Sequence, residues 1–420
     1  QFKMAVGKFE GVEEALTRIG AYTYMMDATR KMTAGAVDLG EKPSVVSAIA
    51  KYHVTERARQ VVNDGMDVVG GKGICLGPSN FMGRAYQQVP IGITVEGANI
   101  LTRSLIIFGQ GAIRCHPFLL AEMQAAQNPN LGKGLVDFDK ALWGHIGFTI
   151  KNGLRALWLG MTGSHFAAVN VDTAPEMKRY YQQMTRFSAA FAFLSDISLL
   201  VLGGSVKRRE KLSARLGDIL SQMYLISCTL KRYEEEGRNA ADAPLAHWAI
   251  WDAMYKAQQA FDGVIANFPV RFIAAILHRS IFPWGHPYVV PSDDLGHQVA
   301  KSLIAPSATR DRLTAECFLP QTENEPVGAI ELALIATLEA EAIEGKIRQA
   351  EKAGRFANNP QANVRDIATV AVECGVITAA EYDVMKRRNH LRDIVVRVDD
   401  FPFDYNVATA NKPALERKAA

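Results

Sequence analysis

Glu96 is a residue whose type and setting suggest acid–base chemistry. It lies in the stretch ITVEGANILTR, between Val95 and Gly97 and close to Ile93 and Ile100. A carboxylate that is partly desolvated by apolar neighbours has a raised pKa, which a general base needs near neutral pH. Gly97 adds no side chain, so a flat substrate or cofactor can lie close. The alternative is a structural role, because an acid near a helix start usually pairs with the positive end of the helix dipole.

A glycine-rich stretch, DVVGGKGICLG, precedes Glu96 and offers a second place for a ligand. Gly70, Gly71 and Gly73 would let backbone N–H groups approach a phosphate or a diphosphate closely. The stretch follows a predicted helix instead of a strand, and no Lys-Ser/Thr pair comes after it. A Rossmann fingerprint and a P-loop therefore both fit poorly. A tight turn between two helices is the alternative explanation.

The other reactive side chains form no recognisable catalytic motif. The sequence contains no HExxH-like ligand spacing and no GxSxG motif, so neither a histidine metal site nor a serine nucleophile is expected. We expect structural or surface roles for the nine histidines. The five cysteines are far apart, which indicates reduced thiols in a cytosolic compartment. The formal charge of +3 is too small, and the basic residues are too scattered, to indicate nucleic-acid binding.

The elements that must position these residues are predicted to be helices. Apolar or small residues recur at helical spacing at Leu16, Ile19, Thr23 and Met26. No strand-rich region is expected, and the contents of 48% hydrophobic and 22% charged residues are those of a soluble globular protein. The predicted fold class is all-α, an antiparallel helical bundle followed by a mostly helical extension. Helices are expected over roughly 12–35, 43–64, 133–163, 174–203, 207–236, 244–281 and 326–354.

The longest apolar run covers residues 187–204 and has two explanations. It is interrupted by Asp196 and is followed by three basic residues at 207–209. A helix buried in the bundle is the preferred explanation, because the run barely reaches the length needed to span a bilayer. Peripheral contact of this helix and its basic flank with an anionic membrane surface is the alternative.

Composition suggests where the domains divide. Residues 281–296 are rich in Pro, Gly and Asp, which is typical of a boundary. Segments 14–35 and 216–237 have the same length, end in glycine and precede a proline and an apolar helix. Duplication of a helical hairpin and coincidence explain this pattern equally well. We expect a helical bundle over 1–115, a helical extension over 116–290 that contains the second hairpin, and a C-terminal helical region with a frayed tail over 291–420.

Three stretches together resemble a known family. QF at residues 1–2, DVVGGKG at 67–73 and VEGANILTR at 95–103 are similar to the spaced motifs of the C-terminal helical domain of the acyl-CoA dehydrogenases. Residues 116–420 resemble the long C-terminal extension of the large bacterial fatty-acyl-CoA dehydrogenases. EGANILTRSLIIFGQGAIRCHP and VVRVDDFP are especially close to that subgroup. The resemblance covers essentially the whole chain, and the combination of motifs is more specific than any one of them.

The resemblance implies a flavin-dependent reaction for Glu96. Enzymes of this family oxidise an acyl-CoA to the trans-2-enoyl-CoA, the first step of fatty acid β-oxidation. Glu96 would remove the α-proton while the β-hydrogen leaves as hydride to FAD, and its backbone N–H would help to hold the thioester carbonyl. Gly97 would leave room for the stacked flavin and thioester. This role requires a poorly hydrated carboxylate, so a Glu96 side chain in bulk solvent would count against it.

The resemblance also implies which residues contact FAD. Gly70, Gly71 and Gly73 would approach its adenosine-diphosphate end, and Gln1 and Phe2 would belong to a second strip that contacts it.

Two cofactor positions depart from the family pattern. The usual glutamine of the glycine turn is Asp67 here, which places a negative charge near the diphosphate. The usual threonine after Glu-Gly is Ala98, so one hydroxyl contact to the flavin is lost. Arg103 matches the arginine of the family motif, and we expect it to have a structural or carboxylate-pairing role.

Partners and location follow from the same resemblance. It implies FAD, a fatty acyl-CoA substrate, electron-transfer flavoprotein as the electron acceptor, a homo-oligomer and a cytoplasmic location, with peripheral contact at the inner membrane left open. Much of the flavin and acyl-chain site of the family lies in domains that these 420 residues do not contain. We therefore expect the chain alone to bind FAD weakly or not at all and to be inactive. The alternative function is a non-catalytic helical module for oligomerisation or membrane-surface docking.

Overall fold

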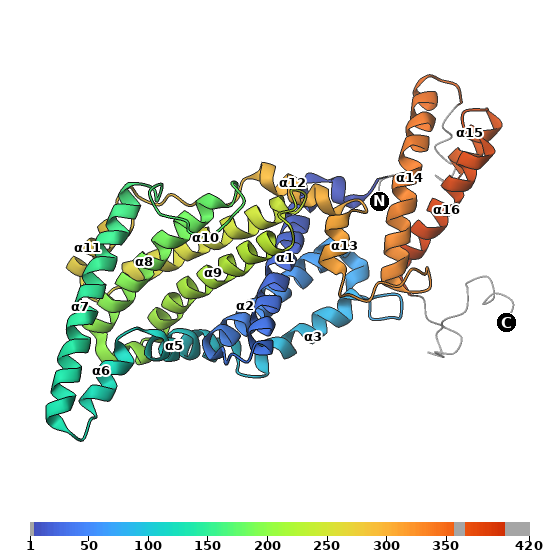
Figure 1. Ribbon diagram of the computed structural model, residues 1–420. Coiled ribbons are helices and arrows are strands. Elements are labelled where there is room, and N and C mark those ends of the chain that lie inside the picture. The colour runs from blue at the N-terminus through green and yellow to red at the C-terminus, as the bar shows by residue number, and fades with distance from the viewer. Residues whose placement is uncertain (1–3, 357–365, 400–420) are drawn as a thin grey trace. The chain divides into compact units, whose positions relative to one another are not determined.

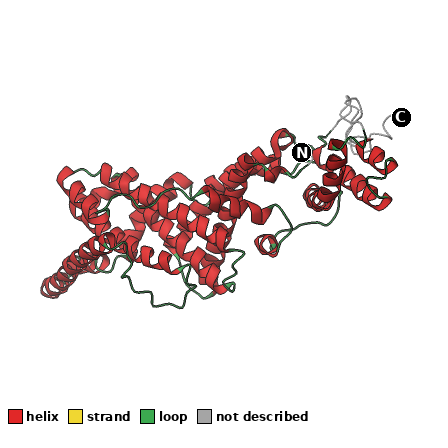
Figure 2. Ribbon diagram, turned by 90° about the horizontal axis from the view of Figure 1, so that it is seen from above, coloured by secondary structure: helices red, strands yellow, loops and turns green. Residues whose placement is uncertain are grey.

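The computed structural model describes residues 4–356 and 366–399, and these residues contain helices and loops but no strand (Figure 2). The prediction of an all-α fold is therefore confirmed. The chain divides into two compact units. The first unit comprises Gln1–Leu16, Val61–Val89 and Ala300–Ala420, and the second comprises Thr17–Gln60 and Pro90–Val299. The domain boundaries expected at 115 and 290 stay predictions.

The helices follow one another through the chain with short connections, and Figure 1 labels most of them. Two short 3₁₀ helices, η2 and η4, and one π-helical segment, η3, interrupt the α-helical series. The elements are η1 (Val6–Lys8), α1 (Glu10–Asp38), α2 (Ser44–Val69), η2 (Gly70–Ile74), α3 (Met82–Thr94), α4 (Asn99–Leu101), η3 (Thr102–Ile106), α5 (Ile107–Cys115), α6 (Leu119–Ala126), α7 (Leu131–Met161), α8 (Lys178–Leu202), η4 (Gly203–Arg208), α9 (Glu210–Glu235), α10 (Ala243–Ala266), α11 (Arg271–Ile281), α12 (Asp293–Leu303), α13 (Ala308–Thr314), α14 (Pro326–Lys352), α15 (Asp366–Glu373) and α16 (Ala379–Val396).

Helices α9 and α10 pack side by side and form the centre of the second unit (Figure 1). Pro244 lies in the first turn of α10, where its missing N–H leaves no hydrogen bond unmade. Along α10, buried apolar side chains recur at three- and four-residue steps, which is the pattern of a helix packed over one wide face. Many of them are alanines, which allow two helix axes to come close. The buried apolar residues of α10 are Leu245, Ala246, Ala249, Ile250, Ala253, Met254, Ala257, Ala260, Phe261, Val264 and Ile265.

One expected helix is two in the structure. The sequence pattern predicted a single helix over 244–281, but α10 ends at Ala266 and α11 begins at Arg271. Pro269 lies in the gap, has no N–H to donate and disfavours helical backbone at the residue before it. The prediction of a continuous helix is therefore wrong, and the proline supplies the physical reason.

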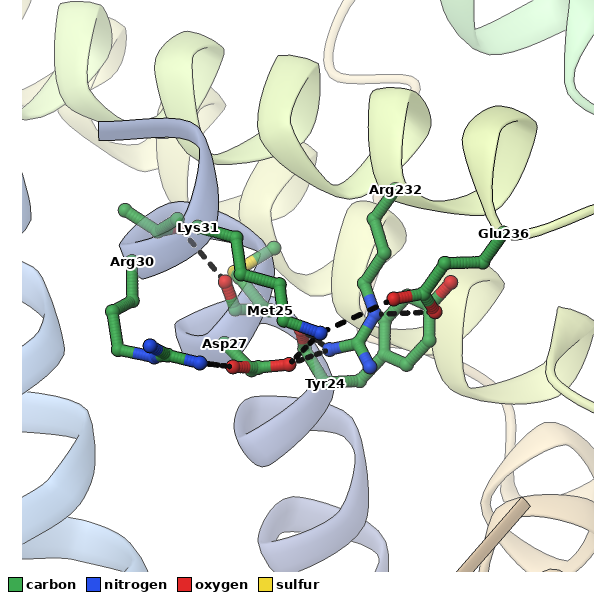
Figure 3. Close-up of polar contacts among 8 residues, drawn as sticks. Tyr24, Met25, Asp27, Arg30, Lys31, Arg232 and Glu236 are labelled. Atoms are coloured by element: carbon green, nitrogen blue, oxygen red, sulfur yellow. Dashed lines mark hydrogen bonds and ion pairs between the residues drawn. The ribbon is translucent and has the colours of Figure 1, made fainter. Parts of the chain in front are cut away.

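An ion-pair network fixes α1 against α9 within the second unit (Figure 3). Arg232 on α9 lies 2.9 Å from Asp27 on α1 and 2.9 Å from Glu236, and it donates to the backbone carbonyl of Tyr24 at 3.0 Å. The guanidinium also lies over the Tyr24 ring, 4.2 Å from its centroid. Arg30 and Lys31 pair with Asp27 from the solvent side. Asp27 therefore forms ion pairs with two exposed cations and with the buried Arg232.

The first unit has its own small core between α14 and α16, which pack side by side (Figure 1). Ile343 and Ile347 on α14 cluster with Ile377 and Met385 near and on α16. Glu344 and Arg388 form an almost fully buried ion pair at 2.6 Å across the same two helices. Each helix therefore buries apolar residues at helical spacing, as an amphipathic pair does.

Candidate active site at the Glu96–Gly97 turn

Glu96 and Gly97 form a sharp turn between α3 and α4 in the second unit. Both residues have positive φ, +55° at Glu96 and +91° at Gly97. Left-handed backbone costs a residue with a Cβ about 1–2 kcal/mol, so the local structure holds Glu96 in an unfavourable conformation. Gly97 adopts the same region without that cost, and a Cβ there would lie 3.3 Å from Thr102 Oγ1. The glycine next to the acid is therefore required by the turn itself.

A polar network anchors this turn to α2. Lys51 Nζ donates to the Gly97 carbonyl at 2.7 Å and to Asn99 Oδ1 at 2.6 Å. Asn99 is buried, and its amide donates to Thr55 Oγ1 at 3.0 Å and to Glu56 Oε1 at 2.8 Å. Sequence reasoning did not find Lys51 or Asn99, because nothing local to either residue indicates its partner.

The turn leaves two backbone hydrogen-bond donors unused and the Glu96 carboxylate exposed. In the described part of the chain, the backbone N–H groups of Glu96 and Gly97 have no hydrogen-bond partner. The Glu96 side chain is exposed and forms no ion pair with another described residue. The turn therefore offers a ligand one carboxylate acceptor and two unpaired backbone donors on adjacent residues.

The expected desolvation of Glu96 is not found. Val95 is 49% exposed and Ile100 is 82% exposed, so neither residue shields the carboxylate from water. The prediction that the apolar neighbours of Glu96 create a water-poor environment is wrong for this chain by itself, because no described segment packs over them. A catalytic role for Glu96 requires a cover from outside the described residues, and that role stays a prediction.

Arg103 forms a paired interaction with Asp218 below the turn. It lies in the π-helical segment η3, and its Nε donates to the Asp218 carboxylate on α9 at 2.8 Å. A second guanidinium nitrogen binds the same carboxylate at 2.5 Å. Burial raises the pKa of Asp218 above its usual range, although Arg103 opposes this shift, whereas the hydrogen bond to Asp218 raises the pKa of Arg103. The expected carboxylate-pairing role of Arg103 is confirmed.

Replacing Arg103 by Met should lower stability in a pH-dependent way. The change leaves the mostly buried Asp218 carboxylate without its main partner. It should lower the free energy of unfolding by about 2 kcal/mol at pH 8, between the typical cost of breaking an exposed ion pair and that of breaking a buried one. The pKa of Asp218 is already raised and would rise further without Arg103. A carboxyl whose folded pKa exceeds its unfolded pKa destabilises the fold fully above the folded pKa. This cost shrinks as pH falls below the folded pKa and is gone only below the unfolded pKa.

Urea unfolding at pH 8 and pH 5 tests this prediction. The difference between Arg103→Met and the wild type should be larger at pH 8. The control is Arg208→Met, which changes an exposed arginine in the same unit and should have little effect at either pH. A pH-independent difference for the Arg103 variant would contradict the prediction.

The glycine turn lies in the first unit and forms the 3₁₀ helix η2. Gly70 has a φ of +69°, and a Cβ on Gly70 or Gly71 would meet no atom within 4 Å. Gly73 is buried, and a Cβ there would lie 3.2 Å from Met66 Sδ. Two of the three glycines thus expose backbone to an approaching group, and the third permits close packing. Asp67 is exposed beside this turn.

Of the other predicted cofactor positions, residues 1–2 and Ala98, the structure describes only Ala98, which shows no contact that supports or opposes a role in FAD binding. Gln1 and Phe2 lie outside the described residues. Ala98 is the N-cap residue of α4 and makes no side-chain cap hydrogen bond. The hydroxyl that the family pattern would place there is absent, as the sequence indicates.

A buried cluster of histidine and acidic residues joins α6, α7 and α8. Asp196 is almost fully buried and accepts hydrogen bonds from His116 Nε2 at 2.9 Å and from Thr149 Oγ1 at 2.8 Å. His145 Nε2 lies 3.6 Å from Asp196 Oδ1, and His145 Nδ1 lies 2.8 Å from Glu122 Oε1. His116, His145 and Asp196 have the donor types of a metal site.

The protonation of His116 opposes metal binding. Its Nδ1 accepts hydrogen bonds from the backbone N–H groups of Phe118 at 3.2 Å and Leu119 at 3.1 Å. A neutral imidazole with an accepting Nδ1 carries its proton on Nε2, the atom that faces Asp196 and that a metal would need unprotonated. The hydrogen bonds of the cluster connect α6, α7 and α8, and the structural role expected for these histidines stays a prediction.

Comparisons with known proteins match two long segments of the chain to one family. Residues 113–401 match the family model described as acyl-CoA dehydrogenase, C-terminal, bacterial type, and residues 1–108 match the model described as acyl-CoA dehydrogenase, C-terminal domain. One similar solved structure is an acyl-CoA dehydrogenase from Bacillus anthracis complexed with FAD. It is 15% identical with a TM-score of 0.50, and the match covers 75% of this chain and 50% of that chain. This likeness concerns the fold, and the chain spans half the length of that relative.

Proposed function

This chain belongs to the acyl-CoA dehydrogenase family, and on that premise we propose that it carries the catalytic glutamate of a flavin-dependent fatty-acyl-CoA dehydrogenase. The observation that supports the proposal is the Glu96–Gly97 turn. Its two residues have left-handed backbone, its N–H groups are free in the described chain, and Lys51 fixes its carbonyl. A strained, anchored turn that presents an acid outward is typical of functional sites.

Gly70 and Gly71 would let FAD approach the glycine turn closely, because each leaves the space of a Cβ open. FAD, when bound, supplies the acceptor for the hydride that leaves the β-carbon of the substrate. Gly73 allows the turn to pack closely against α2. The negative charge of Asp67 would repel the diphosphate, so diphosphate binding here would need a cation from outside the described residues. The expected product is the trans-2-enoyl-CoA, and electron-transfer flavoprotein is the proposed electron acceptor.

Glu96 would act through both its side chain and its backbone. A carboxylate oxygen would take the proton from the carbon next to the thioester carbonyl, in the general-base role. The Glu96 N–H would donate to the thioester oxygen, where negative charge develops as the proton leaves. Gly97 allows the flat thioester to lie against the turn because it has no side chain. The water-poor environment of the base would come from residues outside the described part of the chain.

The full-length enzyme provides the test of this function. Under anaerobic conditions, saturated fatty acyl-CoA should bleach the flavin and yield a trans-2-enoyl-CoA, whereas acyl-CoA should leave these 420 residues alone unchanged. The alternative, a non-catalytic module for oligomerisation or membrane docking, predicts that residues of this chain do not affect flavin reduction. A homo-oligomer in the cytoplasm completes the proposal.

Lys51 should position Glu96 without contacting the substrate. Replacing Lys51 by Met removes the donor to the Gly97 carbonyl, and a turn displaced by about 1 Å should lower kcat by roughly 10- to 100-fold. KM should change little, and Lys51→Arg should restore part of kcat because it returns a cationic donor. The matched control is Lys42→Met, an exposed lysine of the same unit. Stopped-flow flavin reduction measures the effect, and equal rates for the Lys51 and Lys42 variants would contradict this role.

A further inference from the structure

Helix α7 is apolar on two opposite faces. One face packs on α6 and α8 and buries Ala141, Ala156 and Leu159. The other face is open to solvent along its last five turns and carries large apolar side chains at three- and four-residue steps. We call this face, with two residues that lie against it, the α7 surface. It consists of Trp143, Ile146, Ile150, Leu154, Trp158, Met161, Phe166 and Trp284, all exposed.

Two contacts join the last residues of the α7 surface to the helix. The Trp158 and Phe166 rings stack with their centroids 6.4 Å apart. Trp284 Nε1 donates to the backbone carbonyl of Met161 at 3.0 Å. Three of the five tryptophans of the chain are therefore on one surface, and they are 55–78% exposed. A monomeric soluble protein rarely leaves such a large contiguous apolar area uncovered.

The charges beside this surface indicate what covers it. Lys151 and Arg155 are exposed along one edge of the stripe, and residues 141–161 contain no Asp or Glu. Neither cation has an ion-pair partner among the described residues. A second copy packed in register on this face would bring Lys151 and Arg155 against like charges, since no acid lies within residues 141–161. An anionic lipid surface accounts for both the exposed apolar stripe and the unpaired cations beside it. Tryptophan and aliphatic side chains enter the interface, while lysine and arginine bind the headgroups.

The structure favours α7, and not the apolar run at residues 187–204, as the segment that contacts a membrane. Residues 178–208 form a helix that is long and apolar enough to cross a membrane. Within residues 187–200, however, only Ser188 and Leu200 are exposed, and the other side chains are buried or partly buried. Asp196, in the middle of this run, is buried and bound to His116. The apolar character of α8 is thus explained by packing in the bundle, which was the preferred explanation.

We propose that the α7 surface docks this protein on anionic membranes, with α7 lying in the plane of the headgroups. The tryptophan, isoleucine and leucine side chains would enter the acyl boundary, and Lys151 and Arg155 would bind lipid phosphates. This inference does not depend on the proposed catalytic role.

Vesicle binding of the full-length enzyme tests the proposal. The wild type should sediment with vesicles of phosphatidylcholine and phosphatidylglycerol and much less with phosphatidylcholine alone. The double variant Lys151→Glu, Arg155→Glu should partition onto the anionic vesicles at least roughly twentyfold more weakly, since each basic residue near such a surface contributes several-fold. The variant Ile150→Ser, Leu154→Ser should also bind more weakly. Brominated lipids should quench the tryptophan fluorescence of the wild type.

Matched controls separate α7 from the other basic apolar segment. The double variant Lys207→Glu, Arg208→Glu makes the same charge change at two exposed residues after α8 and should bind vesicles as the wild type does. Leu200→Ser, at an exposed leucine of α8, should likewise have no effect. Loss of binding in these controls, or unchanged binding in both α7 variants, would overturn the proposal.

Self-association is the competing outcome, and sedimentation velocity detects it. If the α7 variants change the oligomeric state but bind vesicles normally, the surface is an interface between copies and the lipid proposal is wrong. Flavin content and circular dichroism should be unchanged in every variant, because all the substituted side chains are exposed.

Discussion

Replacing Glu96 by Gln in the full-length enzyme should leave FAD bound and slow flavin reduction by acyl-CoA by about 10²- to 10⁴-fold. Gln retains the size of the side chain and can occupy the same left-handed turn, so the anchoring contacts of Lys51 and Asn99 should persist. It cannot accept the α-proton. The binding of a product-like enoyl-CoA should change little, since the backbone N–H that would hold the thioester is still present.

The matched control for this experiment is Glu210→Gln, which removes another exposed carboxylate of the same unit. It should reduce the flavin at the wild-type rate. Near-normal reduction by the Glu96 variant would contradict the catalytic assignment and favour the non-catalytic alternative. This result is informative because Glu96 is exposed in the described chain and its environment alone does not identify it as a base.

The helices were predictable from sequence where the signal is local. The expected helices over 133–163 and 207–236 match α7 at Leu131–Met161 and α9 at Glu210–Glu235 to within a few residues. Their apolar residues recur at helical spacing over many turns, so each segment specifies its own periodicity. The break before α11 was missed although Pro269 marks it, because the apolar pattern continues on both sides.

The candidate site was predictable only in part. Glu96 and Gly97 stand out from the sequence, and Gly97 indeed occupies backbone that favours glycine. The residues that anchor the turn could not be found, since Lys51 is separated from Gly97 by 46 residues. Exposure was also unpredictable, because the apolar neighbours of Glu96 shield it only if another segment packs over them. Long-range partners and coverage are properties of the tertiary structure.

Replacing Arg232 by Met should destabilise the fold more than replacing Arg103 does. The Arg232 side chain is 3% exposed and contacts Asp27, Glu236 and the Tyr24 carbonyl (Figure 3). Met fills a similar volume but leaves these acceptors without their buried donor. Removing one partner of a buried ion pair typically costs 3–5 kcal/mol, and about 3 kcal/mol is expected here because Arg30 and Lys31 still pair with Asp27. Hydrogen exchange at amides of α1 and α9 measures this change in opening free energy.

The neighbouring residue on the same helix provides the control, and pH provides a second test. Lys231→Met removes a half-exposed lysine that pairs with Glu235 and should cost less than about 1 kcal/mol. Burial raises the pKa of Asp27, but its hydrogen bond with Arg30 and the charge of Arg232 lower it, and the net pKa is below the usual 3.8. Stability from such a depressed carboxyl is present above its unfolded pKa and is lost as pH falls through its folded pKa. The difference between Arg232→Met and the wild type should therefore shrink below about pH 4, whereas a constant difference would mean that lost packing, and not the charge of Asp27, determines the cost.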